Sequence, residues 1–237
     1  MKNRSERKLS VISNAVIGVV LTAVFVLGFS YDKSAPIYGG ETIGAIYRGN
    51  AEKNTVSLMF NVYENTEIVN NILETLKEKG VKATFFVGGC WADDNALTLQ
   101  KIIGYGNELG NHGYFHKDHK KLDYEGNKQE IYITELIVKS LCGEKTTLFA
   151  PPSGSFSDVT LDAASDLGYK VIMWSKDTID WRDKDSSLVY KRATGNPASG
   201  DLILMHPKPH TLSALPQIID FYLINGFTFC TVGENVT

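Results

Sequence analysis

Alternating apolar strands and amphipathic helices run through residues 55–232 of this 237-residue chain. Strands are predicted, from short apolar stretches, at residues 55–61, 81–89, 108–113, 147–152, 169–175, 201–206 and 227–232. Helices are predicted between them at residues 67–80, 95–106, 128–143, 157–168 and 212–225. This repeated alternation favours an α/β fold, in which a parallel sheet, open or closed, carries helices on its outside.

A charge-free apolar run at residues 9–31 follows a basic cluster in residues 1–8. As a helix, the run would span about 34 Å, which is enough to cross a hydrocarbon core of about 30 Å. We therefore predict a cytoplasmic tail, then a single-pass transmembrane signal anchor, with the C-terminal domain outside the cytosol at the cell membrane. The alternative is a cleaved signal peptide, but Ser34-Ala35 is followed by Pro36, which disfavours cleavage.

The segment 32–53 is rich in glycine and proline and is predicted as an extracytoplasmic stalk, followed by one domain at 54–237. Roughly 185–205 residues outside the membrane suit a single α/β domain. A net charge of −3 gives no electrostatic case for nucleic acid as a partner. The three cysteines are widely separated and odd in number, so they indicate neither a disulfide framework nor a zinc knuckle.

Polar residues cluster at the ends of the predicted strands, where parallel barrels place their active sites. They are Asn61, His112, Asp177, Asp180 and His206. His116 follows His112 at a spacing of four, so both imidazoles could point at one ion, although two polar loop residues would show the same spacing. His206 could be a general acid or a satisfied core histidine.

Five segments, in order, give the chain a resemblance to the polysaccharide deacetylases, the NodB-homology enzymes of carbohydrate esterase family 4. VKATFFVGG, GNELGNHGYFH, FAPPSG, DTIDW and DLILMH resemble the family's K-A-T-F-F, G-H-E-[IL]-G-N-H-[ST]-x-x-H, F-R-P-P-[YF]-G, D-x-x-D-W and L-x-H segments. The resemblance covers about Val56 to Val232 and implies a distorted (β/α)7-8 barrel, here preceded by the transmembrane helix. It also implies metal-dependent removal of acetyl groups from glycans such as peptidoglycan, chitin or xylan.

The resemblance assigns roles to individual residues. His112 and His116 match the metal ligands, His206 matches the acid, and Asp180 matches the carboxylate that tunes it. The substrate groove would include Pro151, Pro152, Trp181 and Leu204.

Three positions depart from the family pattern. Asn61 stands in place of the base Asp, Val62 in place of the third metal ligand, and Ala150 in place of an Arg. A neutral amide cannot accept the proton, and two histidines alone would hold zinc or a similar divalent ion weakly. The joint loss of Asp and Arg leaves no buried charge unpaired, so the fold itself should tolerate it.

A replacement for the missing ligand is conceivable in Glu64, Asp118 or His119, and the last would complete a three-histidine site. We expect a membrane-anchored deacetylase-like protein that acts on or binds a peptidoglycan-like cell-wall glycan. The alternative is a catalytically inactive pseudoenzyme that serves as a glycan- or protein-binding module. A glycoside hydrolase would need two facing carboxylates, whereas Asp177 and Asp180 come from one short segment. The MHPKP ending of the last motif resembles a sporulation-associated branch of the family.

Overall fold

A computed structural model of the chain describes residues 44–237. The predicted cytoplasmic tail, the transmembrane segment 9–31 and the first part of the predicted stalk lie outside the described residues. Within residues 44–237, no helix is both long enough and apolar enough to cross a membrane.

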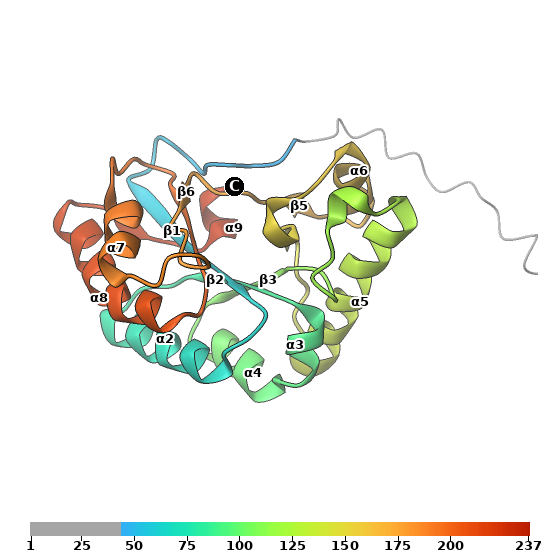
Figure 1. The fold of residues 1–237 in the computed structure, drawn as a ribbon, viewed down its shortest axis with the longest axis horizontal. Coiled ribbons are helices and arrows are strands. Elements are labelled where there is room, and N and C mark those ends of the chain that lie inside the picture. Colours follow the sequence, from blue (N-terminus) through green and yellow to red (C-terminus); the bar gives the residue numbers. More distant parts are fainter. Residues whose placement is uncertain (1–43) are drawn as a thin grey trace, which may run out of the picture. The chain divides into compact units, whose positions relative to one another are not determined.

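The strands form one curled sheet in the order β5-β4-β3-β2-β1-β7-β6, and every pairing is parallel (Figure 1). The first four strands are β1 (Thr55–Val62), β2 (Thr84–Val87), β3 (Glu108–Asn111) and β4 (Leu148–Phe149). The others are β5 (Lys170–Val171), β6 (Lys176–Asp177), β7 (Leu202–Met205) and β8 (Thr228–Phe229), which pairs with the start of β1. Among the described strands, β5 and β6 end the path without pairing to each other, so the α/β fold is a parallel half-barrel.

Helices cover the outside of the sheet (Figure 1). They are α2 (Thr66–Lys79), α3 (Gly89–Asp93), α4 (Ala96–Gly104), α5 (Tyr124–Cys142), α6 (Asp158–Asp166), α7 (Ser186–Thr194) and α8 (Pro209–Ile224). The short helix α9 (Val232–Asn235) lies instead on the inner face, where Val232 packs in an apolar cluster with Met59 and Leu204. Two 3₁₀ turns, η1 (His119–Lys121) and η2 (Pro152–Gly154), follow strand ends. The apolar face that predicts α2 from the sequence is the face that packs on the domain, since its apolar residues from Val69 to Leu76 are buried. Gly80 ends the helix with a left-handed backbone, at φ 66°.

Helix α7 was not predicted from the sequence, because its nine residues carry only a short apolar face. Its signal lies in the cap, since the Asp185 side chain accepts hydrogen bonds from the backbone N–H groups of Ser187 and Leu188. The predicted strand 169–175 is shorter than expected, because only Lys170–Val171 pairs with β4 before the chain turns towards β6.

Side chains alternate across β1, and this alternation fixes which residues can reach a site. Phe60 and Val62 are fully buried in the large apolar core between the sheet and the helices. Met59 packs on the opposite, inner face in a smaller apolar cluster with Ala150 and Leu204. Asn61 follows Met59 on that inner face, so it is the last β1 residue directed into the half-barrel.

The first described residues run beside the free edge of β5. Ile46 forms a parallel bridge to Ile172, in which the Ile46 N–H donates to the Val171 carbonyl at 2.9 Å. The Met173 N–H donates back to the Ile46 carbonyl at 2.8 Å. Residues 44–50, which fall within the predicted stalk, therefore pack against the domain.

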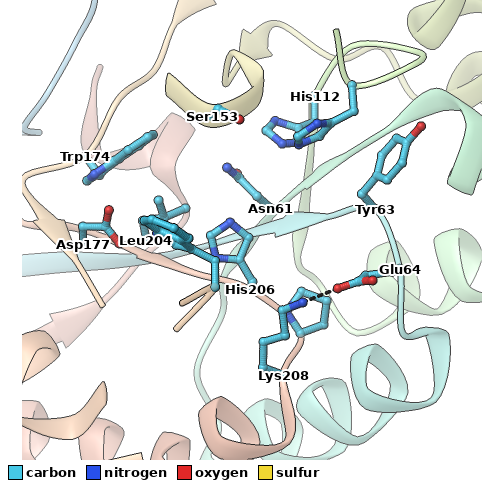
Figure 2. A pocket seen from close by; sticks show the side chains of 13 residues that line it. Asn61, Tyr63, Glu64, His112, Ser153, Trp174, Asp177, Leu204, His206 and Lys208 are labelled. Carbon is cyan, nitrogen blue, oxygen red and sulfur yellow. Dashed lines mark hydrogen bonds and ion pairs between the residues drawn. The ribbon is translucent and has the colours of Figure 1, made fainter. Parts of the chain in front are cut away.

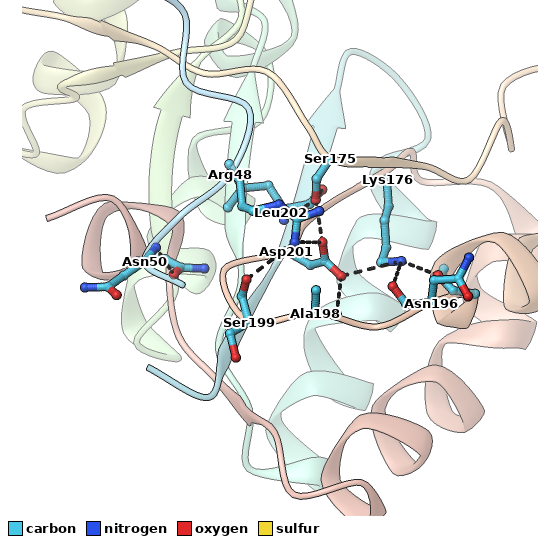
Figure 3. A network of polar contacts seen from close by, with 12 residues as sticks. Arg48, Asn50, Ser175, Lys176, Asn196, Ala198, Ser199, Asp201 and Leu202 are labelled. Atoms are coloured by element: carbon cyan, nitrogen blue, oxygen red, sulfur yellow. Dashed lines mark hydrogen bonds and ion pairs between the residues drawn. The ribbon is translucent and has the colours of Figure 1, made fainter. Parts of the chain in front are cut away.

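A buried carboxylate fixes the same segment on its other side (Figure 3). Asp201 is fully buried and pairs with Arg48 Nη1 at 2.8 Å. It also lies 3.4 Å from Lys176 Nζ and accepts hydrogen bonds from Ser175 Oγ and the Ala198 N–H. With this many partners, the buried charge of Asp201 is well compensated.

Candidate functional site

A pocket of about 440 Å³ lies at the carboxyl ends of the strands (Figure 2). Its walls come from β1, β6, β7 and the loops that follow β1, β3, β4, β5, β6 and β7. The lining residues are Asn61, Tyr63, Glu64, His112, His116, Ser153, Trp174, Asp177, Trp181, Leu204, His206, Pro207 and Lys208. The structure thus brings three histidines from two separate strand ends into one cavity.

His112 directly follows β3 and is 2% exposed. Its Nδ1 lies 2.7 Å from the Ala150 carbonyl oxygen. Because a carbonyl can only accept, Nδ1 carries the hydrogen and Nε2 is left as an acceptor. Burial, and then the charge that His116 could carry, lower the pKa of His112 from 6.5 to about 3. His112 is therefore a neutral ring at working pH.

His116 lies in the loop after β3 with a left-handed backbone, at φ 54°. Its ring centroid is 5.1 Å from that of His112 and 5.0 Å from that of Tyr63. Burial lowers the pKa of His116 as well. The pocket therefore holds two uncharged imidazoles side by side, with an aromatic ring packed on the outer one.

His206 follows β7 and is paired with Asp180 from the loop after β6. His206 Nδ1 lies 2.7 Å from Asp180 Oδ1, and the His206 backbone N–H donates to Oδ2 at 2.7 Å. The Thr211 hydroxyl donates to the same Oδ2 at 2.6 Å. Burial would raise the pKa of Asp180, but the hydrogen bonds from His206 and Thr211 outweigh it and hold that pKa below its ordinary value. Asp180 itself lies behind His206 and does not line the pocket.

Asn61, at the position of the family base, is 5% exposed. Figure 2 shows its amide nitrogen directed into the pocket. Its Oδ1 is buried and, within the described part of the chain, has no hydrogen-bond partner. A side-chain amide offers donors and acceptors but takes up no proton, so Asn61 cannot serve as a general base.

Val62 and Ala150 are uncharged residues at the two positions where the family resemblance implies a metal-binding Asp and an Arg. The Val62 side chain lies in the outer core and is absent from the pocket lining. Ala150 is fully buried in the inner apolar cluster beside Leu204. Within residues 44–237, no group of three histidine, cysteine, aspartate or glutamate side chains could hold a metal ion. The donor set present, two imidazoles and one amide, does not fit the family's Asp-His-His ion.

His119 does not complete a three-histidine site. It is fully buried outside the pocket lining, with Nδ1 2.7 Å from Asn127 Oδ1 and its ring packed on Phe149. Its Nε2 is buried without a hydrogen-bond partner among the described residues.

The two candidate carboxylates are also engaged elsewhere. Asp118 accepts a hydrogen bond from Ser155 Oγ at 2.6 Å and pairs with Lys121 at 2.9 Å. Glu64 does line the pocket, but it forms an ion pair with Lys208 at its rim (Figure 2).

Aromatic side chains form much of the pocket wall. The family motif points to Trp181, which is 57% exposed, and to Leu204, and both line the pocket. Pro151 and Pro152 are buried and do not line it. Tyr63, Trp174 and Ser153 were missed by sequence reasoning. Tyr63 could have been found, because it lies two residues after Asn61 and therefore on the same side of the strand.

A parallel half-barrel with a histidine pair after one strand and a histidine–aspartate pair near another defines the class of NodB-like carbohydrate esterases. The chain belongs to the polysaccharide deacetylase family, because residues 48–172 match the sequence profile of that family. The predicted family is therefore confirmed.

Two relatives are similar to most of this chain, and one of them is named as a deacetylase. The chain is 35% identical over 189 residues to the uncharacterized protein YlxY of Bacillus subtilis, and the match covers 80% of this chain and 59% of that protein. It is 30% identical to the peptidoglycan-N-acetylglucosamine deacetylase of Bacillus cereus, over 78% of this chain and 70% of the relative.

Solved structures show the same fold. A carbohydrate esterase family 4 pseudoenzyme from Bacillus anthracis superposes with a TM-score of 0.79 at 34% identity, over 82% of this chain and 69% of that one. A mutant of that pseudoenzyme, described as having restored enzymatic activity, superposes equally well at 32% identity, over 82% of this chain and 71% of the mutant.

Proposed function

We propose that this protein is a pseudoenzyme that binds a peptidoglycan-like, N-acetylated glycan in the pocket without removing its acetyl groups by the family's chemistry. The observation that carries the proposal is which side chains stand at the carboxyl end of β1 and where they point. Asn61 presents an amide to the pocket where the base should be, and Val62 is turned into the outer core. The cavity, its aromatic wall and its position at the strand ends remain.

The pocket wall suits a sugar. Its cavity of about 440 Å³ falls within the usual range for small-ligand sites. Tyr63, Trp174 and Trp181 offer apolar ring faces, while Asn61, Ser153 and His206 offer hydrogen-bonding groups. The named deacetylase relatives support a peptidoglycan-like glycan as the ligand.

A residual hydrolase is the second candidate, and one observation favours it. His206 and Asp180 keep the geometry of an oriented acid–base group, with the imidazole held through Nδ1. That pair can deliver a proton to a leaving group, but the described residues offer no carboxylate at the Asn61 position to take one from water.

The location forms part of the proposal. The basic cluster in residues 1–8 and the charge-free run 9–31 support a single-pass membrane anchor, with the domain outside the cytosol. Such an anchor would keep the pocket close to a wall polymer.

Binding and acetate release, measured on the same preparation, test the proposal. The full-length chain, purified in mild detergent, should bind an N-acetylglucosamine tetramer in calorimetric titration. Trp181→Ala should weaken that binding by at least about tenfold. Tyr132→Ala, which removes an exposed aromatic side chain on α5 that does not line the pocket, should leave it unchanged.

The same protein, supplied with Zn²⁺ or Co²⁺, should release no more acetate than a His112→Ala/His116→Ala variant. Release above that control would establish the residual hydrolase instead. Absence of any tetramer binding would overturn the glycan-binding role.

A further inference from the structure

A buried carboxylate holds the loop that carries His116. Glu130, on α5, is 3% exposed. Its Oε2 accepts hydrogen bonds from the backbone N–H groups of Tyr114 at 2.9 Å and Phe115 at 2.7 Å. Hydrogen bonds to an ionised acceptor are stronger than neutral ones, so these two contacts fix the loop backbone firmly.

The other oxygen of Glu130 is also used. Oε1 pairs with Lys117 Nζ at 2.8 Å, and Lys117 is half-exposed. One carboxylate thus binds three residues of the loop, on both sides of His116. The buried charge has a cation and two backbone donors as partners, which makes its burial tolerable.

Helix α5 holds the loop at both ends as well. The Asn111 side chain accepts from the Gly113 N–H at 2.9 Å and donates to the Ile131 carbonyl at 2.8 Å. Asn127 accepts from His119 Nδ1 at 2.7 Å. The segment from His112 to His119 is therefore fastened to one helix along its length by protein groups.

From these contacts we infer that Glu130 is a positioning residue for the loop from His112 to His119. It keeps this loop, and with it the pocket, in the shape that binds the glycan without a metal ion. The inference rests on the proposed function, because it makes glycan binding independent of metal. His116 keeps a left-handed backbone at φ 54°, which a non-glycine residue adopts only when its surroundings enforce it. The contacts of Glu130 with the residues just before and after it supply that enforcement.

Hydrogen exchange tests the loop directly. In the full-length chain treated with a chelator, the amides of Tyr114 and Phe115 should be protected, and adding Zn²⁺ should not change their exchange rates. Glu130→Ala should make both amides exchange faster by at least about tenfold. Fast exchange in the chelated wild-type chain, slowed by Zn²⁺, would overturn the inference.

Tetramer binding tests the consequence for the pocket. The affinity of the wild-type chain for an N-acetylglucosamine tetramer should be the same with chelator and with Zn²⁺. Glu130→Gln keeps an oxygen acceptor for the two N–H groups but loses the charge that pairs with Lys117, so its affinity should lie between those of the wild type and of Glu130→Ala. Glu125→Gln, the same change at an exposed site on α5, should have no effect.

The two failures can be told apart. If the wild-type chain binds no tetramer, the proposed function is wrong, while the exchange rates still decide whether Glu130 holds the loop. If the tetramer binds only in the presence of Zn²⁺, the metal-independent pocket is wrong. If Glu130→Ala does not fold, the Glu130→Gln and Glu125→Gln pair gives the decision, because equal exchange and equal affinity in both would overturn the inference.

Discussion

At the scale of single residues, the site keeps some residues of the family pattern and replaces others. The sequence was enough to locate these positions, but not to predict the side-chain orientations and contacts around them. Motif order was enough to locate Asn61, His112 and His206, because each lies next to the carboxyl end of a strand. The orientation of Val62 into the outer core and the role of Glu130 depend on strand alternation and on a helix distant in sequence. Neither contact leaves a local signature in the sequence.

A carboxylate at position 61 should destabilise the folded chain. Asn61→Asp places an acid at a site only 5% exposed, with no Arg at Ala150 to pair with it. We expect a loss of about 1–3 kcal/mol in the free energy of unfolding at pH 7.

Burial should raise the pKa of the carboxyl group introduced by Asn61→Asp, so the loss should be present above that pKa and should fade as the pH falls and the group becomes neutral. Urea denaturation at several pH values measures this. Asn71→Asp, the same change on the exposed face of α2, provides the control. Equal losses in the two variants at pH 7 would contradict the prediction.

His112 should make the domain sensitive to mild acid. Its folded pKa of about 3 lies below the ordinary 6.5, so between these values the unfolded chain takes up a proton that the folded chain refuses. His112 alone should therefore lower the free energy of unfolding by up to about 1.4 kcal/mol for each pH unit below about 6.5.

His112→Asn keeps a donor for the Ala150 carbonyl and removes the titrating ring. Urea denaturation in the presence of a chelator should show that this variant loses about 2 kcal/mol less than the wild type between pH 6.5 and pH 5. An identical pH dependence in the two proteins would refute the assignment.

At the scale of elements, strand–helix alternation predicted a parallel sheet with helices outside it, but not which segments lie at the edges of the sheet. The described part of the predicted stalk joins the domain through backbone hydrogen bonds of Ile46 and Gly49 and through the Arg48–Asp201 pair. Backbone hydrogen bonds depend little on the side chains present. The composition of this glycine- and proline-rich segment therefore could not predict that it pairs with the sheet. Helix α7 escaped prediction for a related reason, since its cap is more distinctive than its short apolar face.

The Arg48–Asp201 pair should stabilise the edge of the sheet. Arg48→Ala leaves the fully buried Asp201 with Lys176 at 3.4 Å as its remaining cation. Because Arg48 is 44% exposed, solvent screening reduces the effect, and we expect a loss of about 1–2 kcal/mol in the free energy of unfolding.

Chemical denaturation of the full chain measures the loss. Arg182→Ala removes an arginine from a more exposed ion pair with Asp183 and should change little. If the Arg182 variant were the less stable of the two, the buried-carboxylate argument would be wrong.

At the scale of the whole molecule, a membrane anchor and a binding pocket would act together. We expect the full chain to sediment with membranes and to resist extraction by alkaline carbonate, whereas a chain lacking residues 1–31 should be soluble. In intact spheroplasts, added protease should degrade the domain if it lies outside the cytosol. A protected domain would contradict the proposed orientation.

The attachment of residues 44–50 beside β5 also has a mechanical consequence. Among the described residues, a pull from the N-terminal side of the chain first meets Ile46, bonded to Val171 and Met173, and then Arg48, bonded to Asp201. The parallel bridge and the ion pair must give way before force reaches β1, which carries Asn61 at its far end. Tension would therefore load the sheet edge beside β5 before it reaches the strand that carries Asn61.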